Sequence, residues 1–131
     1  MIAINDVVNA SQIKLKVKNR DLFMKLSEKD NINLINESRW SEMFFCFAIG
    51  FHRNFKNDFT GGESYVNYPS LKEDVKFIAS LILERDGDDI DSVQKFWTVF
   101  ESYCEGGYYL IMQSLENNNG RFILDDIMGD V

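Results

Sequence analysis

The stretch FWTVFESYCEGGYYLIMQSLE, residues 96–116, decides the fold of this chain. Its apolar residues recur at the three- and four-residue spacing of an amphipathic helix that packs on a core. Gly106 and Gly107 interrupt that spacing, and each glycine inside a helix costs roughly 1 kcal/mol relative to alanine. Either the helix breaks at these glycines or another backbone packs closely against them. We expect the helix to begin at Asp89 or Asp91.

Two further helices are predicted upstream of this stretch. The first begins at Ser38 or Ser41 and contains MFFCFAIGF, residues 43–51. This segment is apolar on nearly all sides, which predicts that it is the central and most buried helix. The second begins at SLKE, residues 70–73, which fits a capping box, and it ends at Gly87.

A strand is predicted near the amino terminus. The segment IKLKVK, residues 13–18, alternates apolar residues with lysines, and a period of two is typical of a half-buried strand. Because a single strand leaves its backbone groups unpaired, it needs a partner, either residues 65–68 or the same strand of a second subunit. A short helix follows, capped by Asn19 or Asp21. Its inward-facing residues are expected to be Leu22, Phe23 and Leu26.

Length and composition fit one domain. The chain has 131 residues, of which 45% are hydrophobic and 27% are charged, an ordinary globular composition. The predicted fold class is mainly α with a minor α+β element: a compact bundle of about four to five helices with one short amino-terminal β-strand or β-ribbon. Within the single domain 1–131, residues 1–12 are expected to be flexible and residues 117–131 to be peripheral.

The charge is unevenly distributed along the chain. Residues 1–60 carry nine Lys/Arg and seven Asp/Glu, a balance of +2, so residues 61–131 carry −9 of the total of −7. An acidic second half repels phosphate, which argues against nucleic-acid binding by that half. It favours either solubility or a basic partner.

Cysteine use and hydropathy predict a cytoplasmic protein without a membrane anchor. Cys46 and Cys104 lie in apolar stretches and are expected to be buried thiols, since two cysteines form no disulfide framework. The segment MIAINDVVNA, residues 1–10, lacks the pattern of a signal peptide. The longest apolar run, residues 43–51, is about half the ~20 residues of a membrane-spanning helix.

The sequence shows no catalytic or metal-binding pattern. His52 is the single histidine, and no acid or cysteine is placed as its partner for general-base or nucleophilic chemistry. We interpret Glu101 and Glu105, four residues apart, as a solvated helix face. The aspartates in residues 86–91 lack the glycine and closing glutamate of a calcium loop. The sequence therefore predicts no enzyme, no cofactor and no bound metal.

Lysines on the predicted strand are a candidate DNA-contact surface. A paired ribbon fits the major groove, and a strand followed by two helices is the order found in ribbon-helix-helix regulators. The alternative is a purely structural role, in which the lysines protect an edge strand from aggregation. The candidate contact residues are Lys14, Lys16, Lys18, Arg20, Arg39 and Arg53.

Aromatic residues on the 96–116 helix are a candidate partner interface. Tyr and Trp anchor interfaces because they bury large area and keep a polar tip. Tyr108 and Tyr109 are adjacent, so both cannot face one core and one of them is expected at the surface. Trp97 is the third candidate, although its spacing fits a core position as well.

Two segments together resemble a known family. They are WSEMFFCFAIGFHRNF, residues 40–55, and residues 96–116, in which ESYCEGG at 101–107 is the most specific part. They are similar to the small proteins associated with bacterial DNA phosphorothioation (Dnd) systems, of the associated protein 4 type. The resemblance implies close packing at Gly106 and Gly107 and no catalytic residues.

The same resemblance implies a non-enzymatic accessory subunit of a bacterial DNA-modification or anti-phage defence system. Such a subunit would bind a larger protein partner, with DNA as a further candidate. Two alternatives stay open: a dimeric ribbon-helix-helix-like DNA-binding regulator, which would be a homodimer, and an acidic phage-encoded inhibitor whose second half copies the charge of DNA.

Overall fold

The computed structural model describes residues 2–10, 13–28, 38–67, 72–120 and 125, and these form five α-helices and a two-stranded sheet. The mainly helical class with a small β-ribbon is therefore confirmed. In chain order the elements are α1 (Ile4–Val8), β1 (Lys14–Val17), α2 (Arg20–Met24), the 3-10 turn η1 (Lys25–Glu28), α3 (Arg39–His52), β2 (Glu63–Asn67), α4 (Lys72–Asp86), the 3-10 turn η2 (Gly87–Asp89) and α5 (Val93–Asn117).

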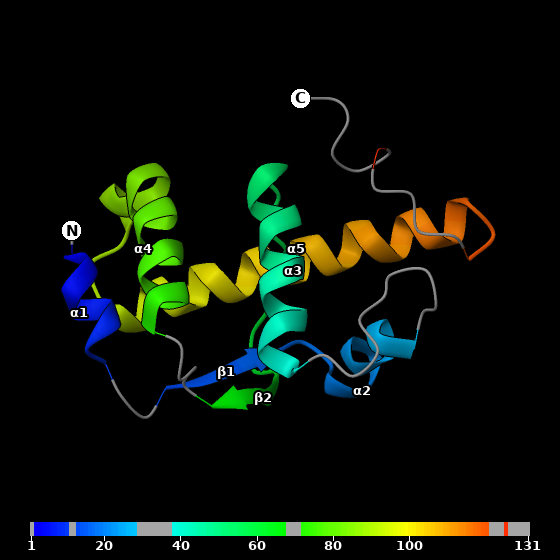
Figure 1. Cartoon of the computed structure of the whole chain (residues 1–131), viewed down its shortest axis with the longest axis horizontal. Helices are drawn as coiled ribbons and strands as arrows, with labels where there is room; N and C mark the ends of the chain where they lie inside the picture. Colours follow the sequence, from blue (N-terminus) through cyan, green and yellow to red (C-terminus); the bar gives the residue numbers. More distant parts are fainter. Residues whose placement is uncertain (1, 11–12, 29–37, 68–71, 121–124, 126–131) are drawn as a thin grey trace.

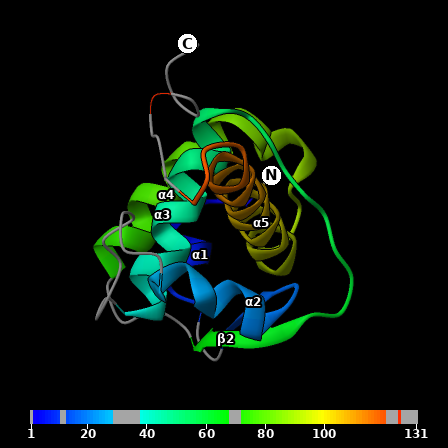
Figure 2. The ribbon, with the colours of Figure 1, turned by 90° about the vertical axis from the view of Figure 1, so that its right-hand side faces the viewer.

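Helix α5 is the centre of the fold. It runs the length of the molecule, and α3 and α4 lie across it (Figure 1). Seen nearly along α5, α3 and α4 lie on one side, α2 and β2 lie below, and the connection from α3 to β2 passes on the other side (Figure 2). The prediction that the 43–51 helix is the central one is therefore wrong, because α3 packs mainly on α5 whereas α5 also contacts α1, α4 and β1.

The glycine pair in α5 marks a close crossing with α3, and the helix continues through it without a break. A Cβ on Gly107 would overlap the carbonyl oxygen of Cys46, and one on Gly106 would overlap that of Phe55. Gly50 on α3 is equally tight against the backbone of α5. Of the two alternatives for the glycines, close backbone packing is therefore confirmed.

The β-ribbon joins two segments that are far apart in the sequence. β1 pairs antiparallel with β2, and the register is irregular between Leu15 and Lys16. Leu15 and Val17 are fully buried, while Lys14 and Lys16 face outward, so the predicted alternation is confirmed. The predicted partner segment 65–68 overlaps β2 as far as Asn67, and Tyr68 lies outside the described residues.

Side-chain caps begin three of the helices. Asn19 accepts the backbone N–H of Leu22 at 3.0 Å at the start of α2, and Ser38 accepts that of Ser41 at 3.1 Å at the start of α3. Both positions were among those predicted. Helix α5 is capped by Ser92 instead of Asp89 or Asp91, because Asp89 belongs to the η2 turn.

Several other expectations need correction or fall outside the described residues. Leu22 is 46% exposed, so only Phe23 and Leu26 face inward on the α2–η1 segment. Ile4–Val8 form a helix that packs on α4 and buries Val7, and the flexibility of residues 1–12 stays a prediction. The start of the predicted capping box at 70–71 and most of residues 117–131 lie outside the described residues.

Candidate functional site

Two glutamates of α5 cover the outer edge of β1. The backbone N–H of Lys16 donates to Oε2 of Glu101 at 2.6 Å, and that of Lys18 donates to Oε1 of Glu105 at 2.9 Å. Glu105 is only 4% exposed. The interpretation of this pair as a solvated face is therefore wrong, because the open strand edge supplies donors that carboxylates can satisfy.

Burial changes the acidity of both carboxyl groups. Desolvation raises the pKa of Glu101 to about 7, although its hydrogen bond from Lys16 and the charge of that lysine oppose the shift. The neighbouring Glu105 adds a smaller upward contribution to the pKa of Glu101. Desolvation also raises the pKa of Glu105, and the backbone N–H and charge of Lys18 oppose it. Both groups bind a proton more tightly than an exposed glutamate does.

A pocket of about 350 Å³ opens beside Glu105, and we call it the Tyr108 pocket. Its lining residues are Lys18, Asn19, Leu22, Asn57, Glu105, Tyr108 and Tyr109. They come from the end of β1, from α2, from the connection between α3 and β2, and from α5. The pocket thus exists only because the fold brings four separate segments together.

Two contacts hold the wall formed by the connection from α3 to β2. The backbone N–H of Asn57 donates to the carbonyl of Ser102 at 3.0 Å. The backbone of Phe55 lies so close to α5 that only a glycine fits at position 106. Gly106, which the sequence marked as structural, therefore positions one side of the Tyr108 pocket.

The two adjacent tyrosines differ in exposure, as predicted. The ring of Tyr108 is half-buried and stacks on Phe23 with 5.2 Å between centroids, and its hydroxyl donates to the carbonyl of Leu22 at 3.3 Å. Tyr109 is 47% exposed and its ring lies 5.8 Å from that of Phe55. Tyr108 thus joins α5 to α2, and Tyr109 forms part of an exposed rim.

Trp97 does not join these tyrosines. It is 3% exposed and its ring meets those of Phe96 and Phe100 at 5.0 and 5.4 Å. It also lies at a second cavity of about 410 Å³ between β1 and α5, which Lys14, Lys16 and Glu101 line as well. Trp97 is therefore a core residue, and its place among the candidate interface residues is wrong.

One oxygen of Glu105 has no partner in the described structure. Oε1 accepts from Lys18, but Oε2 is buried and accepts no hydrogen bond from the described residues. Buried polar atoms are nearly always hydrogen-bonded, so each exception calls for an explanation. Glu105 lines the Tyr108 pocket, and its Oε2 is itself buried from solvent.

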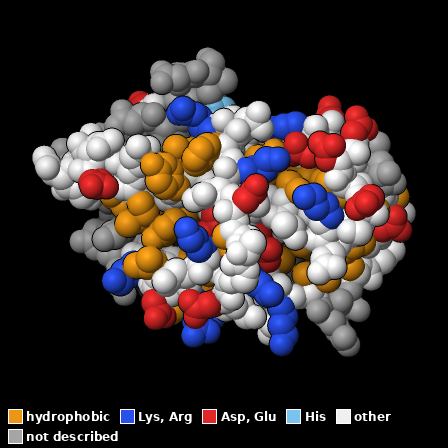
Figure 3. Space-filling view, turned by 180° about the vertical axis from the view of Figure 1, so that it is seen from behind, with side chains coloured by type: hydrophobic (Ala, Val, Ile, Leu, Met, Phe, Trp, Pro, Cys, Tyr) orange, Lys and Arg blue, Asp and Glu red, His pale blue; other side chains and the backbone are white. Residues whose placement is uncertain are grey.

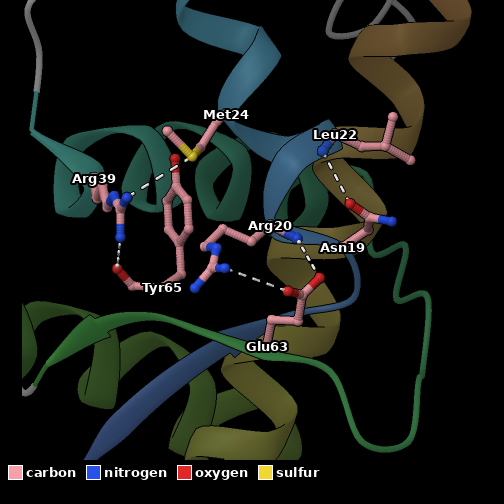
Figure 4. A network of polar contacts seen from close by, with 7 residues as sticks. All are labelled: Asn19, Arg20, Leu22, Met24, Arg39, Glu63 and Tyr65. Carbon is pink, nitrogen blue, oxygen red and sulfur yellow. Dashed lines mark hydrogen bonds and ion pairs between the residues drawn. The ribbon is translucent and has the colours of Figure 1, made fainter.

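The candidate DNA-contact residues do not form one positive surface. Arg20 lies 3.7 Å from a carboxylate oxygen of Glu63, and Arg39 donates to the carbonyl of Tyr65 at 3.2 Å (Figure 4). Arg53 follows the far end of α3, and the 14 residues of that helix span about 20 Å. Lys and Arg side chains are interspersed with Asp and Glu across the back face (Figure 3).

Arg39 and Tyr65 belong to a structural network between α3 and β2. The guanidinium of Arg39 lies 4.9 Å from the centre of the Tyr65 ring, and the Tyr65 hydroxyl donates to Oε1 of the buried Glu42 at 2.8 Å. Desolvation raises the pKa of Glu42, while the hydrogen bond from Tyr65 and the charge of Arg39 lower it. Arg39 therefore stabilises the contact between α3 and β2.

The described residues contain no group of three or more His, Cys, Asp or Glu that could hold a metal ion. In the same part of the chain, no helix combines the length and the apolar character needed to cross a membrane. His52 is exposed at the end of α3. Comparison with known proteins finds no matching family model, no matching curated protein and no matching solved structure.

Proposed function

We propose that this protein is a non-enzymatic accessory subunit that binds a larger protein partner through the rim of the Tyr108 pocket. The observation that carries the proposal is an exposed apolar rim around a preformed pocket. Leu22 is 46% exposed, Tyr109 is 47% exposed and Phe55 is 36% exposed. Apolar side chains gather on the back face over α2 and the carboxyl-terminal half of α5 (Figure 3).

Such a rim has the anatomy of a protein interface. Interface anchors are commonly aromatic residues set in or beside a pocket, with a polar surround. A contiguous apolar patch on the surface of a small domain is unfavourable in water, and such patches commonly mark sites where a partner binds. The pocket is already open, so binding requires little rearrangement of this chain.

The geometry favours a protein partner over DNA. β1 pairs with β2 along one edge, and the N–H groups of Lys16 and Lys18 on the other edge are bonded to Glu101 and Glu105. A ribbon shared with a second copy would have to displace one of these. Because the two glutamates lie beside β1 at its open edge, their negative charge weakens the attraction of the neighbouring lysines for phosphate.

The biological setting rests on the family resemblance. Residues 40–55 and 96–116 resemble Dnd-associated proteins, which suggests a cytoplasmic assembly that modifies DNA or restricts phage. The acidic-inhibitor alternative rests on the charge of residues 61–131 alone, and it stays a prediction.

A pull-down with matched variants tests the interface. The tagged chain, a Leu22→Ser/Tyr109→Ser variant and a Phe77→Ser control are each expressed in the cells that encode the protein. Phe77 is 54% exposed on α4, outside the rim. Phe77→Ser therefore also replaces an exposed apolar side chain by serine and controls for that change. The partner is expected with the unchanged chain and the control and to be lost with the double variant. Equal capture by all three contradicts the proposed interface.

A further inference from the structure

We propose that the Tyr108 pocket takes a basic side chain of the partner, a lysine or an arginine, with its cationic head at Glu105. Its methylene stem then packs between Leu22 and Tyr109. The inference rests on the proposed function only for the source of that side chain, because the pocket and its carboxylate are features of this chain alone.

The carboxylate of Glu105 supplies the recognition. One oxygen is held by the backbone N–H of Lys18, which fixes the orientation of the group, and the other lacks a donor among the described residues. A buried acceptor without a partner costs about 1–3 kcal/mol, and more when it is charged. Rotation of the Glu105 carboxylate toward the pocket would bring this oxygen to an incoming ammonium or guanidinium N–H, which would remove that cost and neutralise the charge.

The walls of the pocket fit the stem of a long basic side chain. Leu22 and the rings of Tyr108 and Tyr109 offer apolar surface near the mouth, and Asn57 offers an amide. Lysine and arginine bury their methylene groups along such surfaces while the charged head seeks a polar partner. Tyrosine faces also attract cations.

The charge around the pocket needs to be weighed against this assignment. Lys18 lines the pocket and binds Glu105 through its backbone N–H. Its positive charge also lowers the pKa of Glu105, although the two side chains form no ion pair in the described structure. Glu101 lies one turn away on α5 and outside the pocket, and with its pKa raised to about 7 it adds negative charge mainly above that pH. The lining thus carries one positive and one negative side chain, and the feature that favours a cation is the unpartnered oxygen of Glu105 rather than the net charge.

A titration with small probes tests the cation directly. The ¹⁵N-labelled chain is titrated with n-butylammonium, n-butylguanidinium and butan-1-ol, which share a four-carbon stem and differ in the head group. Both cations are expected to bind in the millimolar range and at least tenfold more tightly than the alcohol. The shifted amides are expected at Leu22, Asn57 and Tyr108. Equal affinity for alcohol and cations, or shifts elsewhere, overturns the proposal.

Two conservative variants extend the test. Glu105→Gln keeps an acceptor for Lys18 and removes the charge, so it is expected to weaken cation binding at least tenfold and to leave butan-1-ol unchanged. Glu101→Gln, one turn away, is expected to change cation binding less than threefold. Cation binding that survives Glu105→Gln contradicts the assignment. The comparison of cation with alcohol on the unchanged chain needs no variant, so it decides the question even if Glu105→Gln does not fold.

The pull-down separates failure of this inference from failure of the proposed function. If Leu22→Ser/Tyr109→Ser loses the partner and Glu105→Gln retains it fully, the interface stands and the cation assignment is wrong. If all variants keep the partner while Glu105 still selects butylammonium over butan-1-ol, the pocket is a cation site and the proposed interface is wrong.

Discussion

Glu101 accepts the backbone N–H of Lys16 at 2.6 Å, across 85 residues of sequence. One turn further along α5, Glu105 accepts the N–H of Lys18. Helix residues four apart advance about 6 Å, and strand residues two apart advance about 6.8 Å, so the two spacings match. A pair of glutamates on a helix thus takes the place of a neighbouring strand and closes the edge of β1.

The pH dependence of stability follows from Glu101. Its pKa is about 7 in the folded chain against an ordinary value of 4.5, so the folded state holds the proton more tightly. The contribution of Glu101 to the free energy of unfolding is therefore highest below about pH 4.5. It falls as the pH rises to about 7. Glu105 and Glu42, whose pKa values are also raised, act in the same direction.

Glu101→Gln is expected to flatten this dependence. The amide oxygen still accepts from Lys16, and the charge is gone. After allowance for partial exposure of the group, we expect the variant to be about 1–2 kcal/mol more stable at pH 8 and nearly unchanged at pH 4.5. Urea denaturation at the two pH values measures the difference. An unchanged slope between them means that Glu101 is an ordinary exposed carboxylate.

The crossing of α3 and α5 is expected to tolerate no side chain at Gly107. Its Cβ would overlap the Cys46 carbonyl, which is backbone and cannot rotate away. We expect Gly107→Ala to lower the free energy of unfolding by about 3 kcal/mol, the upper part of the range for overpacking, despite the better helix propensity of alanine. Gln113→Ala, at an exposed position on the same helix, is the control and should change stability by less than about 0.5 kcal/mol. A neutral Gly107→Ala variant would show that the helices can move apart.

Local patterns in the sequence predicted the elements well. The alternation over residues 13–18 gave the strand and its buried face, and Asn19 and Ser38 cap the helices that follow them. The interruption at Gly106 and Gly107 left a helix break and a close backbone approach as alternatives, and the structure shows the close approach. These features depend on neighbours within a few residues.

The candidate site depended on contacts that no local pattern contains. The role of Glu105 requires Lys18, and the exposure of Leu22 follows from how α2 lies against the ring of Tyr108. The signal for the glutamates was present in their four-residue spacing, but a solvated face has the same spacing. Only the tertiary arrangement distinguishes a solvated pair of glutamates from a pair that bonds to a strand. For the same reason, the sequence could not show that Trp97 is buried in the core.

The two thiols are expected to react only when the chain unfolds. Cys46 and Cys104 are fully buried, and burial together with nearby glutamate carboxylates raises the pKa of each thiol. Since the thiolate is the reactive form, a disulfide exchange reagent should label neither residue rapidly in the native state at pH 8. Both should react at once in concentrated urea, which gives the control. Rapid native labelling of either thiol would mean that the α3–α5 contact opens readily.

The last prediction contrasts a buried hydrogen bond with an exposed ion pair in one region. Tyr65→Phe removes the donor to Oε1 of Glu42, a residue that is 4% exposed and whose Oε2 already lacks a partner among the described residues. We expect it to cost about 2–3 kcal/mol, because a buried acceptor loses its hydrogen bond. Arg20→Met breaks the pair with Glu63, and both of those side chains are 44% exposed, so the expected cost is below about 1 kcal/mol.

Thermal and urea unfolding of these two variants measure the contrast, and Glu42→Gln/Tyr65→Phe completes a double-mutant cycle for the buried pair. If burial sets the energies, adding salt should change the stability difference of Arg20→Met and leave that of Tyr65→Phe nearly constant, because exposed charges are screened and buried hydrogen bonds are not. Equal costs for both variants would mean that water reaches Glu42 and that the contact between α3 and β2 is looser than its geometry indicates.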